Sequence, residues 1–275
     1  MTTSLSLLPL IQQADTASFV AHVQALGAHY PQVGAAAAPW GDGALLYGGP
    51  GSPLNRAVGL IDDGAPLGAL VDAAEVFFGA RSAACAIDCY PEVTPRLAGL
   101  LRGRGYRSHD PVRTLVAALP VSLGPNTGRV TAADTDDYDL WVATVTAGFR
   151  EGPRPLGSDD QRTMLARAAV RPDVRLFLAH LDGEPIGGAA LGRTHPVGFL
   201  FSGSVLPPYR GLGAQRALIH ARLVAAMGEG LQFAVSGAAP GSVSERNLRR
   251  SGLDPLFLRE TWVNVLAISA LQWWA

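Results

Sequence analysis

The residues best suited to chemistry stand in a glycine-rich turn that contains Arg210, Gly211 and Gly213. The turn follows an apolar stretch, Val197–Leu206, that has the composition of a β-strand, and it leads into Ala214–Met227, whose apolar residues recur at helical spacing. A strand, a glycine turn and a helix in this order gather free backbone N–H groups at the positive end of the helix dipole. The glycines allow a ligand to approach closely, and the arginine adds a guanidinium that suits phosphate oxygens. The pattern predicts a site for a phosphate or a pyrophosphate.

Two common nucleotide-binding motifs are excluded. The Rossmann fingerprint requires a third glycine three residues after the second, but Arg216 stands there, and Glu229 ends the same helix instead of following a second strand. The P-loop requires a lysine, and the chain contains none.

The turn instead resembles the acetyl-CoA loop of the GNAT N-acetyltransferase superfamily, R/Q-x-x-G-x-G/A after a strand that ends in V-x-P-x-Y. The matching residues are Val205, Pro207, Tyr209, Arg210 and Gly213, whereas Gln215 stands where that pattern prefers glycine or alanine. The resemblance implies acetyl-CoA as a cosubstrate, with its pantetheine arm along Val205 and Leu206. It implies pyrophosphate contacts from the loop and the helix start, and a further contact from Asn247; the loop residues are Arg210, Gly211, Leu212, Gly213, Ala214 and Gln215.

The pattern of elements extends the resemblance over the C-terminal half. Helices are expected from Asp134 to about Phe149, over Ser158–Val170, Ala214–Met227 and Ser242–Ser251, and strands over Arg129–Ala132, Val174–Leu181, Pro185–Arg193, Val197–Leu206, Leu231–Val235 and Phe257–Ala267. This β-α-α-β-β-β-α-β-α-β order is the GNAT order.

The N-terminal half repeats part of this order. Helices are expected over Phe19–Ala28, Leu67–Phe78 and Val93–Leu101, and strands over Gly43–Gly48, Ala57–Ile61, Ala83–Cys89 and Val112–Ala118. No arginine–glycine loop precedes its helix, because Asp62-Asp63-Gly64 stands there instead. We therefore expect an α/β (α+β) fold of two tandem GNAT-like domains, each a mixed, mostly antiparallel sheet flanked by helices: residues 1–124 a degenerate domain and residues 125–275 the acetyltransferase domain. The turn-rich segment Val121–Gly128 is the expected linker.

Acid–base chemistry is where the sequence departs from the family. Many relatives carry a glutamate at the position of Phe199 and a tyrosine acid at the position of Leu248, and both are apolar here. The replacement candidates for catalysis are Ser202, Ser204 and Glu151. The alternatives remain open: strand hydroxyls bonded to the backbone, a solvated glutamate in a loop, and for Asn247 a helix-surface or capping role.

Composition narrows the class of protein. The chain has 275 residues, a net charge of −1 and a pI near 6.6, so no electrostatic footprint for nucleic acid or a membrane is present. Cys85 and Cys89 are expected to be two buried thiols, and no metal site is expected. The first eleven residues lack the basic start of a signal peptide, so we expect a cytoplasmic protein, as a monomer or a homodimer.

These observations favour an acyl-CoA-dependent N-acyltransferase that moves an acetyl group to a primary amine of a small molecule or an amino acid. A non-catalytic CoA-binding sensor or scaffold is the alternative, favoured by the apolar residues at Phe199 and Leu248. An interaction protein, in which the loop would have no purpose, ranks last.

Overall fold

The computed structural model describes residues 2–61, 64–90, 94–124, 128–150 and 159–264. Its α-helices are α1 (Thr2–His29), α2 (Leu67–Gly79), α3 (Pro95–Gly103), α4 (Tyr138–Arg150), α5 (Asp159–Ala168), α6 (Ala214–Gly228) and α7 (Val243–Arg250). Its strands are β1 (Ala36–Trp40), β2 (Gly43–Tyr47), β3 (Arg56–Val58), β4 (Ala86–Cys89), β5 (Tyr106–Ala118), β6 (Val130–Asp134), β7 (Val174–Leu181), β8 (Glu184–Thr194), β9 (Val197–Val205), β10 (Phe233–Ala238) and β11 (Asp254–Asn264). Among the described residues, no helix is long and apolar enough to cross a membrane.

The chain divides into two compact units. Unit 1 contains the chain up to Arg113 together with the segment from Phe257 onward, and unit 2 is Thr114–Leu256. Each unit therefore includes part of β5 and part of β11. The boundary expected between residues 124 and 125 falls inside unit 2, and as a division between two family domains it stays a prediction.

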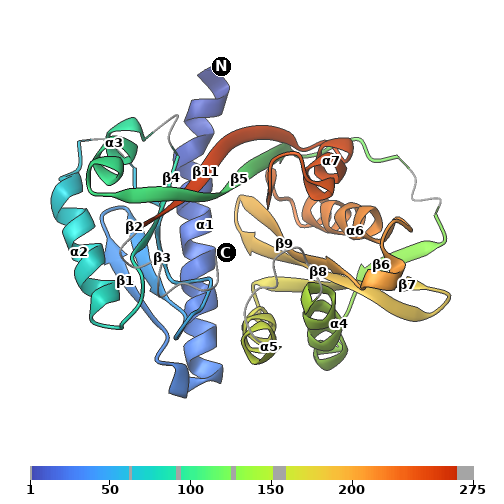
Figure 1. Ribbon diagram of the computed structural model, residues 1–275. Helices are drawn as coiled ribbons and strands as arrows, with labels where there is room; N and C mark the ends of the chain where they lie inside the picture. The colour runs from blue at the N-terminus through green and yellow to red at the C-terminus, as the bar shows by residue number, and fades with distance from the viewer. Residues whose placement is uncertain (1, 62–63, 91–93, 125–127, 151–158, 265–275) are drawn as a thin grey trace. The chain divides into compact units, whose positions relative to one another are not determined.

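Unit 1 is a mixed sheet with helices on both faces. Its strands follow the order β1-β2-β3-β4-β11, in which only β3 and β4 are parallel, and α2 connects these two. Alternate residues of β2 face opposite sides: Leu45 packs in the cluster of α2 and α3, whereas Leu46 packs with Val23 of α1. Figure 1 shows α1 on one side of this sheet and α2 and α3 on the other.

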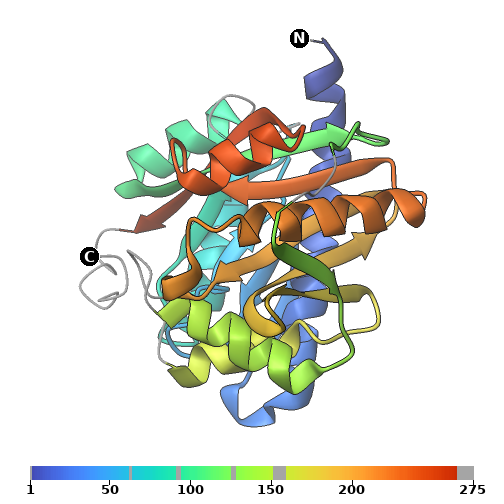
Figure 2. The same ribbon diagram turned by 90° about the vertical axis from the view of Figure 1, so that its right-hand side faces the viewer.

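Unit 2 repeats this plan with longer strands. Its order is β6-β7-β8-β9-β10-β5, with antiparallel ladders from β6 to β9 and a parallel pair, β9 and β10, connected by α6. Phe177 and Leu191 face α6, while their neighbours Leu176 and Ala190 face α4 and α5. Figures 1 and 2 show α6 and α4 on opposite faces. Leu115 and Ala117 of β5 belong to the core under α6.

The predicted element order of the C-terminal half is confirmed, and β7 has the bounds given by its apolar pattern. Two features of the N-terminal half were not expected. The first helix begins at Thr2, not at Phe19, because buried Leu8, Ile11 and Ala14 recur every third residue and continue its apolar face. Strand β1 was not expected, since alanine has a low strand propensity, but β1 pairs with β2 along its whole length. Both cysteines are buried free thiols, as expected.

Candidate active site

The candidate site lies where β9 and β10 separate in unit 2. Their parallel ladder runs from Val197 opposite Phe233 to Phe199 opposite Val235, and the Ser236 hydroxyl then donates to the Leu200 carbonyl at 2.9 Å. Beyond that point β9 continues to Val205 and β10 to Ala238, with no further ladder pair among the described residues. The two strands therefore form a V that opens toward their carboxyl ends.

The backbone of β9 offers an N–H to this V. The Leu206 N–H donates to the Ile186 carbonyl of β8 at 2.9 Å, so this amide is already used. Because backbone groups alternate in direction along a strand, the N–H and carbonyl of Val205 point the other way, toward the β10 side. Of the two residues expected to contact the pantetheine arm, Val205 presents its amide and Leu206 does not.

A β-bulge interrupts β9 just before Val205. The β8 ladder pairs Gly188 with Ser204 and then Ala190 with Phe201, so Ser202 and Gly203 together oppose one residue of β8. Ser202 has a φ of +50°, a left-handed conformation that is costly for a residue with a side chain. Backbone strain of this kind is typical of functional sites.

The two serines proposed for catalysis have different surroundings. The Ser204 hydroxyl is buried, at 6% exposure, and donates to the Val145 carbonyl of α4 at 3.2 Å. Ser202 is half-buried in the bulge, and its hydroxyl has no hydrogen-bond partner among the described residues. Glu151, the third candidate, lies outside the described residues.

The glycine loop ends at the first turn of α6, as expected. Gly211 and Gly213 have φ values of +83° and +93°, so both positions favour glycine. Gly213 caps the helix without a side-chain hydrogen bond, which leaves the first N–H groups of a 15-residue helix available to an anion. Ala214 is buried, whereas Leu212 is exposed beside this turn.

Arg210 contacts the protein backbone. Its Nε donates to the Val205 carbonyl at 3.3 Å, and its Nη2 donates to the Gly148 carbonyl at the end of α4 at 3.2 Å. The guanidinium therefore connects the loop, the last residue of β9 and α4. A bound anion would share this side chain with two carbonyl groups.

Asn247 and Gln215, expected separately to contact CoA, lie together. Asn247 Nδ2 donates to Gln215 Oε1 at 2.6 Å, and Gln215 Nε2 donates to Ser244 Oγ at 2.9 Å. Ser242 caps α7 by accepting from the Glu245 N–H at 3.1 Å. The start of α7 is thereby fixed beside the start of α6.

Comparisons with known proteins find a matching family model and similar solved structures. The family model described as "Acetyltransferase (GNAT) family" matches residues 139–243. Over residues 139–243 the chain is therefore similar to GNAT acetyltransferases. A comparison with curated proteins finds no match.

Solved structures extend the fold over most of the chain. A GCN5-related N-acetyltransferase from Kribbella flavida has a TM-score of 0.62 and 18% identity, covering 88% of this chain and 95% of its own. A GCN5-related N-acetyltransferase from Sphaerobacter thermophilus has a TM-score of 0.57 and 18% identity, covering 75% and 70%. A tandem GNAT protein from the clavulanic acid biosynthesis pathway has a TM-score of 0.58 and 17% identity, covering 80% and 77%. At these identities the likeness shows the fold alone, and the fold is that of tandem GNAT proteins.

Unit 2 has apolar side chains where the family resemblance places a base and an acid. Phe199 is 7% exposed and Leu248 is 2% exposed, and both belong to the packed interior of unit 2. Within the described parts of the chain, no group of three metal-binding side chains is found.

Sequence reasoning missed some residues of unit 2. Arg216 is exposed on the first turn of α6, and Ser236 lies at the start of the V. Arg222 is buried on α6 and donates to the Phe201 carbonyl at 3.3 Å. Arg216 stood inside the motif and was visible in the sequence. The other two depend on strand pairing, which no local pattern reveals.

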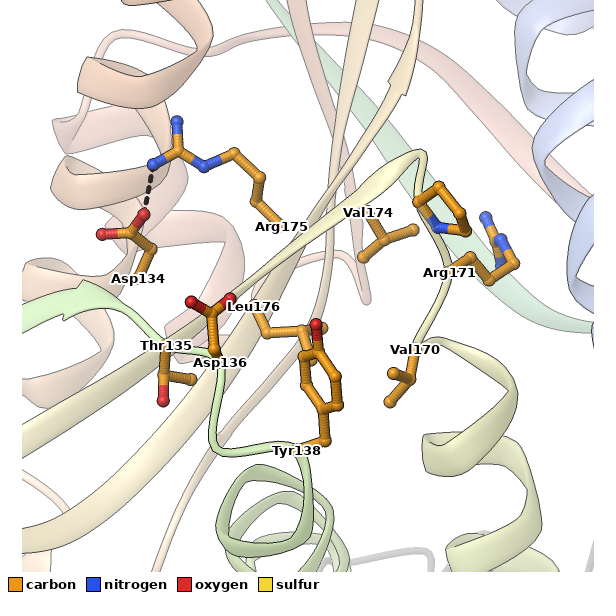
Figure 3. A pocket seen from close by; sticks show the side chains of 10 residues that line it. Asp134, Thr135, Asp136, Tyr138, Val170, Arg171, Val174, Arg175 and Leu176 are labelled. Atoms are coloured by element: carbon orange, nitrogen blue, oxygen red, sulfur yellow. Dashed lines mark hydrogen bonds and ion pairs between the residues drawn. The ribbon is translucent and has the colours of Figure 1, made fainter.

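A pocket of about 450 Å³ lies elsewhere in unit 2 (Figure 3). It is lined by the end of β6 with the residues that follow it, and by the start of β7 with the residues that precede it. Arg175 bridges Asp134 at 2.5 Å and Glu229 at 3.0 Å. Because β6 to β9 are successively antiparallel, these strand ends are at the opposite edge of the sheet from Val205. The pocket is therefore separate from the candidate site.

Proposed function

We propose that unit 2 binds acetyl-CoA in the V between β9 and β10 and transfers the acetyl group to a primary amine of a small molecule or an amino acid. The observation that supports this most is the separation of β9 from β10 directly before a helix with uncapped N–H groups. An extended arm fits the open strand edge, and a pyrophosphate fits the helix start.

In this proposal the backbone of β9 polarises the thioester. The Val205 N–H donates to the carbonyl oxygen, which gains negative charge as the amine attacks. The new C–N bond forms at the acetyl carbon, the C–S bond breaks, and the thiolate of CoA leaves. The amine loses one proton and the thiolate takes up one, so proton transfer is required on both sides.

Ser202 is the described side chain that we propose for part of this proton transfer. It stands in the bulge, three residues before Val205, and its hydroxyl has no partner among the described residues. Ser204 is a poorer candidate because its hydroxyl is directed to the Val145 carbonyl. Glu151 remains a proposal from sequence alone.

The acceptor is proposed from the side chains of β9 and from the net charge of the whole chain. Phe199 and Phe201 lie on the strand that leads into the V, and the chain is nearly neutral overall. A small amine or an amino acid suits these properties better than a polycation or a basic peptide, which would require an acidic surface.

A CoA-binding sensor is the second candidate, and a specific observation favours it. The positions that supply the base and the acid in many relatives are filled by buried Phe199 and Leu248. A site that binds CoA without turnover would need the loop and the strand edge but no titrating group.

One experiment separates the two candidates. Acetyl-CoA is titrated into the protein by calorimetry, and free CoA release is then followed across a panel of primary amines. Binding with turnover on one class of amine supports the transferase, and binding without turnover on any supports the sensor. The absence of binding would contradict both.

A further inference from the structure

Arg222 is a buried cation with no counter-ion in the described part of the chain. It lies on the third turn of α6, is 3% exposed, and has no ion pair with any described residue. Burial lowers the pKa of its guanidinium to about 9, and no charged neighbour contributes to that shift. The side chain is therefore still charged at neutral pH, and an isolated buried charge is costly unless it is well hydrogen-bonded.

Among the described residues, the guanidinium donates to backbone carbonyls alone. Nε donates to the Leu218 carbonyl one turn earlier in α6 at 3.0 Å. Nη1 donates to the carbonyls of Ala190 on β8 and Phe201 on β9, at 3.4 and 3.3 Å. These two residues form the last regular ladder pair before the bulge.

The other terminal nitrogen, Nη2, lies beneath the bulge itself. A Cβ atom placed on Gly203 would lie 3.7 Å from Arg222 Nη2 and within 4 Å of no other neighbour. Arg222 thus contacts the strand before the bulge with one nitrogen and lies under the extra residue with the other.

The bulge decides the direction of every later group on β9. Before it, Leu200 faces α6 and Phe201 faces α4. After it, Ser204 faces α4, where it bonds to Val145, and Val205 faces α6. Phe201 and Ser204 are three residues apart yet face the same side, which a regular strand forbids. Without the extra residue, the Val205 N–H would point toward β8 instead of into the V.

We propose that Arg222 is a positioning residue that holds the β9 bulge by binding the backbone carbonyls of Ala190 and Phe201, and so aims the Val205 N–H at the acyl-pantetheine arm of the cosubstrate. This inference rests on the proposed function, since it assigns the arm to the β9 edge. The nucleotide end of the cosubstrate is held elsewhere, at the glycine loop and the start of α6. Arg222 should therefore affect the two ends of the same ligand unequally.

The test compares two ligands by calorimetry: acetyl-CoA, and adenosine 3′-phosphate 5′-diphosphate, which is its nucleotide half without the arm. Arg222→Met is similar in length but uncharged. This variant should bind acetyl-CoA about tenfold more weakly or worse, as expected for lost hydrogen bonds to a charged group. Binding of the nucleotide should stay within about threefold of wild type. Arg129→Met removes an arginine that is 78% exposed and should change neither affinity.

Hydrogen exchange of the ligand-free protein provides a second readout that does not depend on binding. In Arg222→Met the amides of residues 202–205 should exchange faster, while those of β7 and of α6 beyond its contact turn keep wild-type protection. Arg222→Lys keeps the charge but has one nitrogen in place of three. This variant replaces Arg222→Met in the test if the methionine variant fails to fold. It should give the same pattern more weakly.

The outcomes are distinct. Equal weakening of both ligands, or wild-type affinity for both in a folded variant, would overturn the positioning role. Unchanged exchange at residues 202–205 would overturn it as well. If wild type binds neither ligand, the proposed function fails, whereas a local change in exchange would still show that Arg222 holds the bulge.

Discussion

Asn247 donates a 2.6 Å hydrogen bond to Gln215, which joins α7 to the first turn of α6 through two side-chain amides. Gln215 uses the other end of its amide to donate to Ser244 at 2.9 Å. Both ends of this amide are therefore occupied within the protein. The two residues form one structural element beside the uncapped N–H groups of α6, and any effect on a ligand there should be shared.

Substitution of these two residues should be non-additive. Asn247→Ala and Gln215→Ala should each weaken the binding of acetyl-CoA by roughly three- to tenfold. The double variant should bind only slightly more weakly than the weaker-binding single variant, because residues within one network are coupled. Calorimetric titration of the wild type, the two single variants and the double variant measures the coupling free energy between the two residues. Combining Asn247→Ala with the remote Arg129→Ala should be additive. Additive losses for Asn247 and Gln215 would mean that they contact the ligand independently.

The loop variant Arg210→Ala with Gly213→Val should abolish acetyl-CoA binding and leave the fold intact. Valine at a φ of +93° is strained, and the variant also loses the arginine contacts to Val205 and Gly148. Gly183→Val is a matched control, since Gly183 has a φ of +89° in the β7–β8 turn with no neighbour within 4 Å. It should cost about 1–2 kcal/mol of stability, as one left-handed residue does, with wild-type binding. Unchanged affinity in the loop variant would refute the assignment.

This loop was readable from the sequence because its chemistry is local. The positive φ values of Gly211 and Gly213 and the uncapped helix start depend on consecutive residues only. The same holds for β7 and the hairpin that follows it, whose alternating residues and Asp182-Gly183 turn are adjacent in the chain.

The remaining features depend on distant partners. Arg222 looks like one more helix arginine until the pairing of β8 with β9 places two carbonyls above it. Strand β5 was assigned to the first domain, yet Leu115 and Ala117 complete the core under α6. In the same way, Ala36–Trp40 becomes a strand only because β2 pairs with it. Such non-local pairing leaves no short-range signal.

The two serines of β9 should separate into a catalytic and a structural residue. Ser204→Ala removes the buried hydrogen bond to Val145 and should cost about 1 kcal/mol of stability, as such bonds typically do, with little change in kcat. Ser202→Ala removes a hydroxyl without a described partner, so stability should hold while kcat falls about tenfold or more if Ser202 moves a proton. Thermal unfolding and steady-state kinetics with the best amine measure both. A Ser202→Ala protein with wild-type kcat would remove it from the mechanism.

Unit 1 contains a partly buried ionic cluster between α1 and its sheet. Asp88 is 3% exposed and lies 3.6 Å from Arg56 and 3.5 Å from Arg259, measured between the closest charged atoms. Arg259 also lies 3.7 Å from Asp15 of α1, and the Thr261 hydroxyl donates to Asp88 at 2.7 Å. The cluster contains two carboxylates and two guanidinium groups, so its stability depends on their charge states.

Asp15 should make the stability of unit 1 depend on pH. Burial raises its pKa to about 6 against the opposing charge of Arg259, whereas an unfolded aspartate ionises near 4. The folded protein therefore keeps this proton between about pH 4 and pH 6, and the stability that Asp15 contributes at low pH is lost as pH rises through 6. Asp15→Asn stays neutral at every pH. Its free energy of unfolding minus that of wild type should therefore be about 1–3 kcal/mol higher at pH 7.5 than at pH 4. Denaturant unfolding at both pH values measures this. Gln13→Ala, at an exposed position of α1, should show a constant difference from wild type. A constant difference for Asp15→Asn as well would show that burial does not shift this carboxyl.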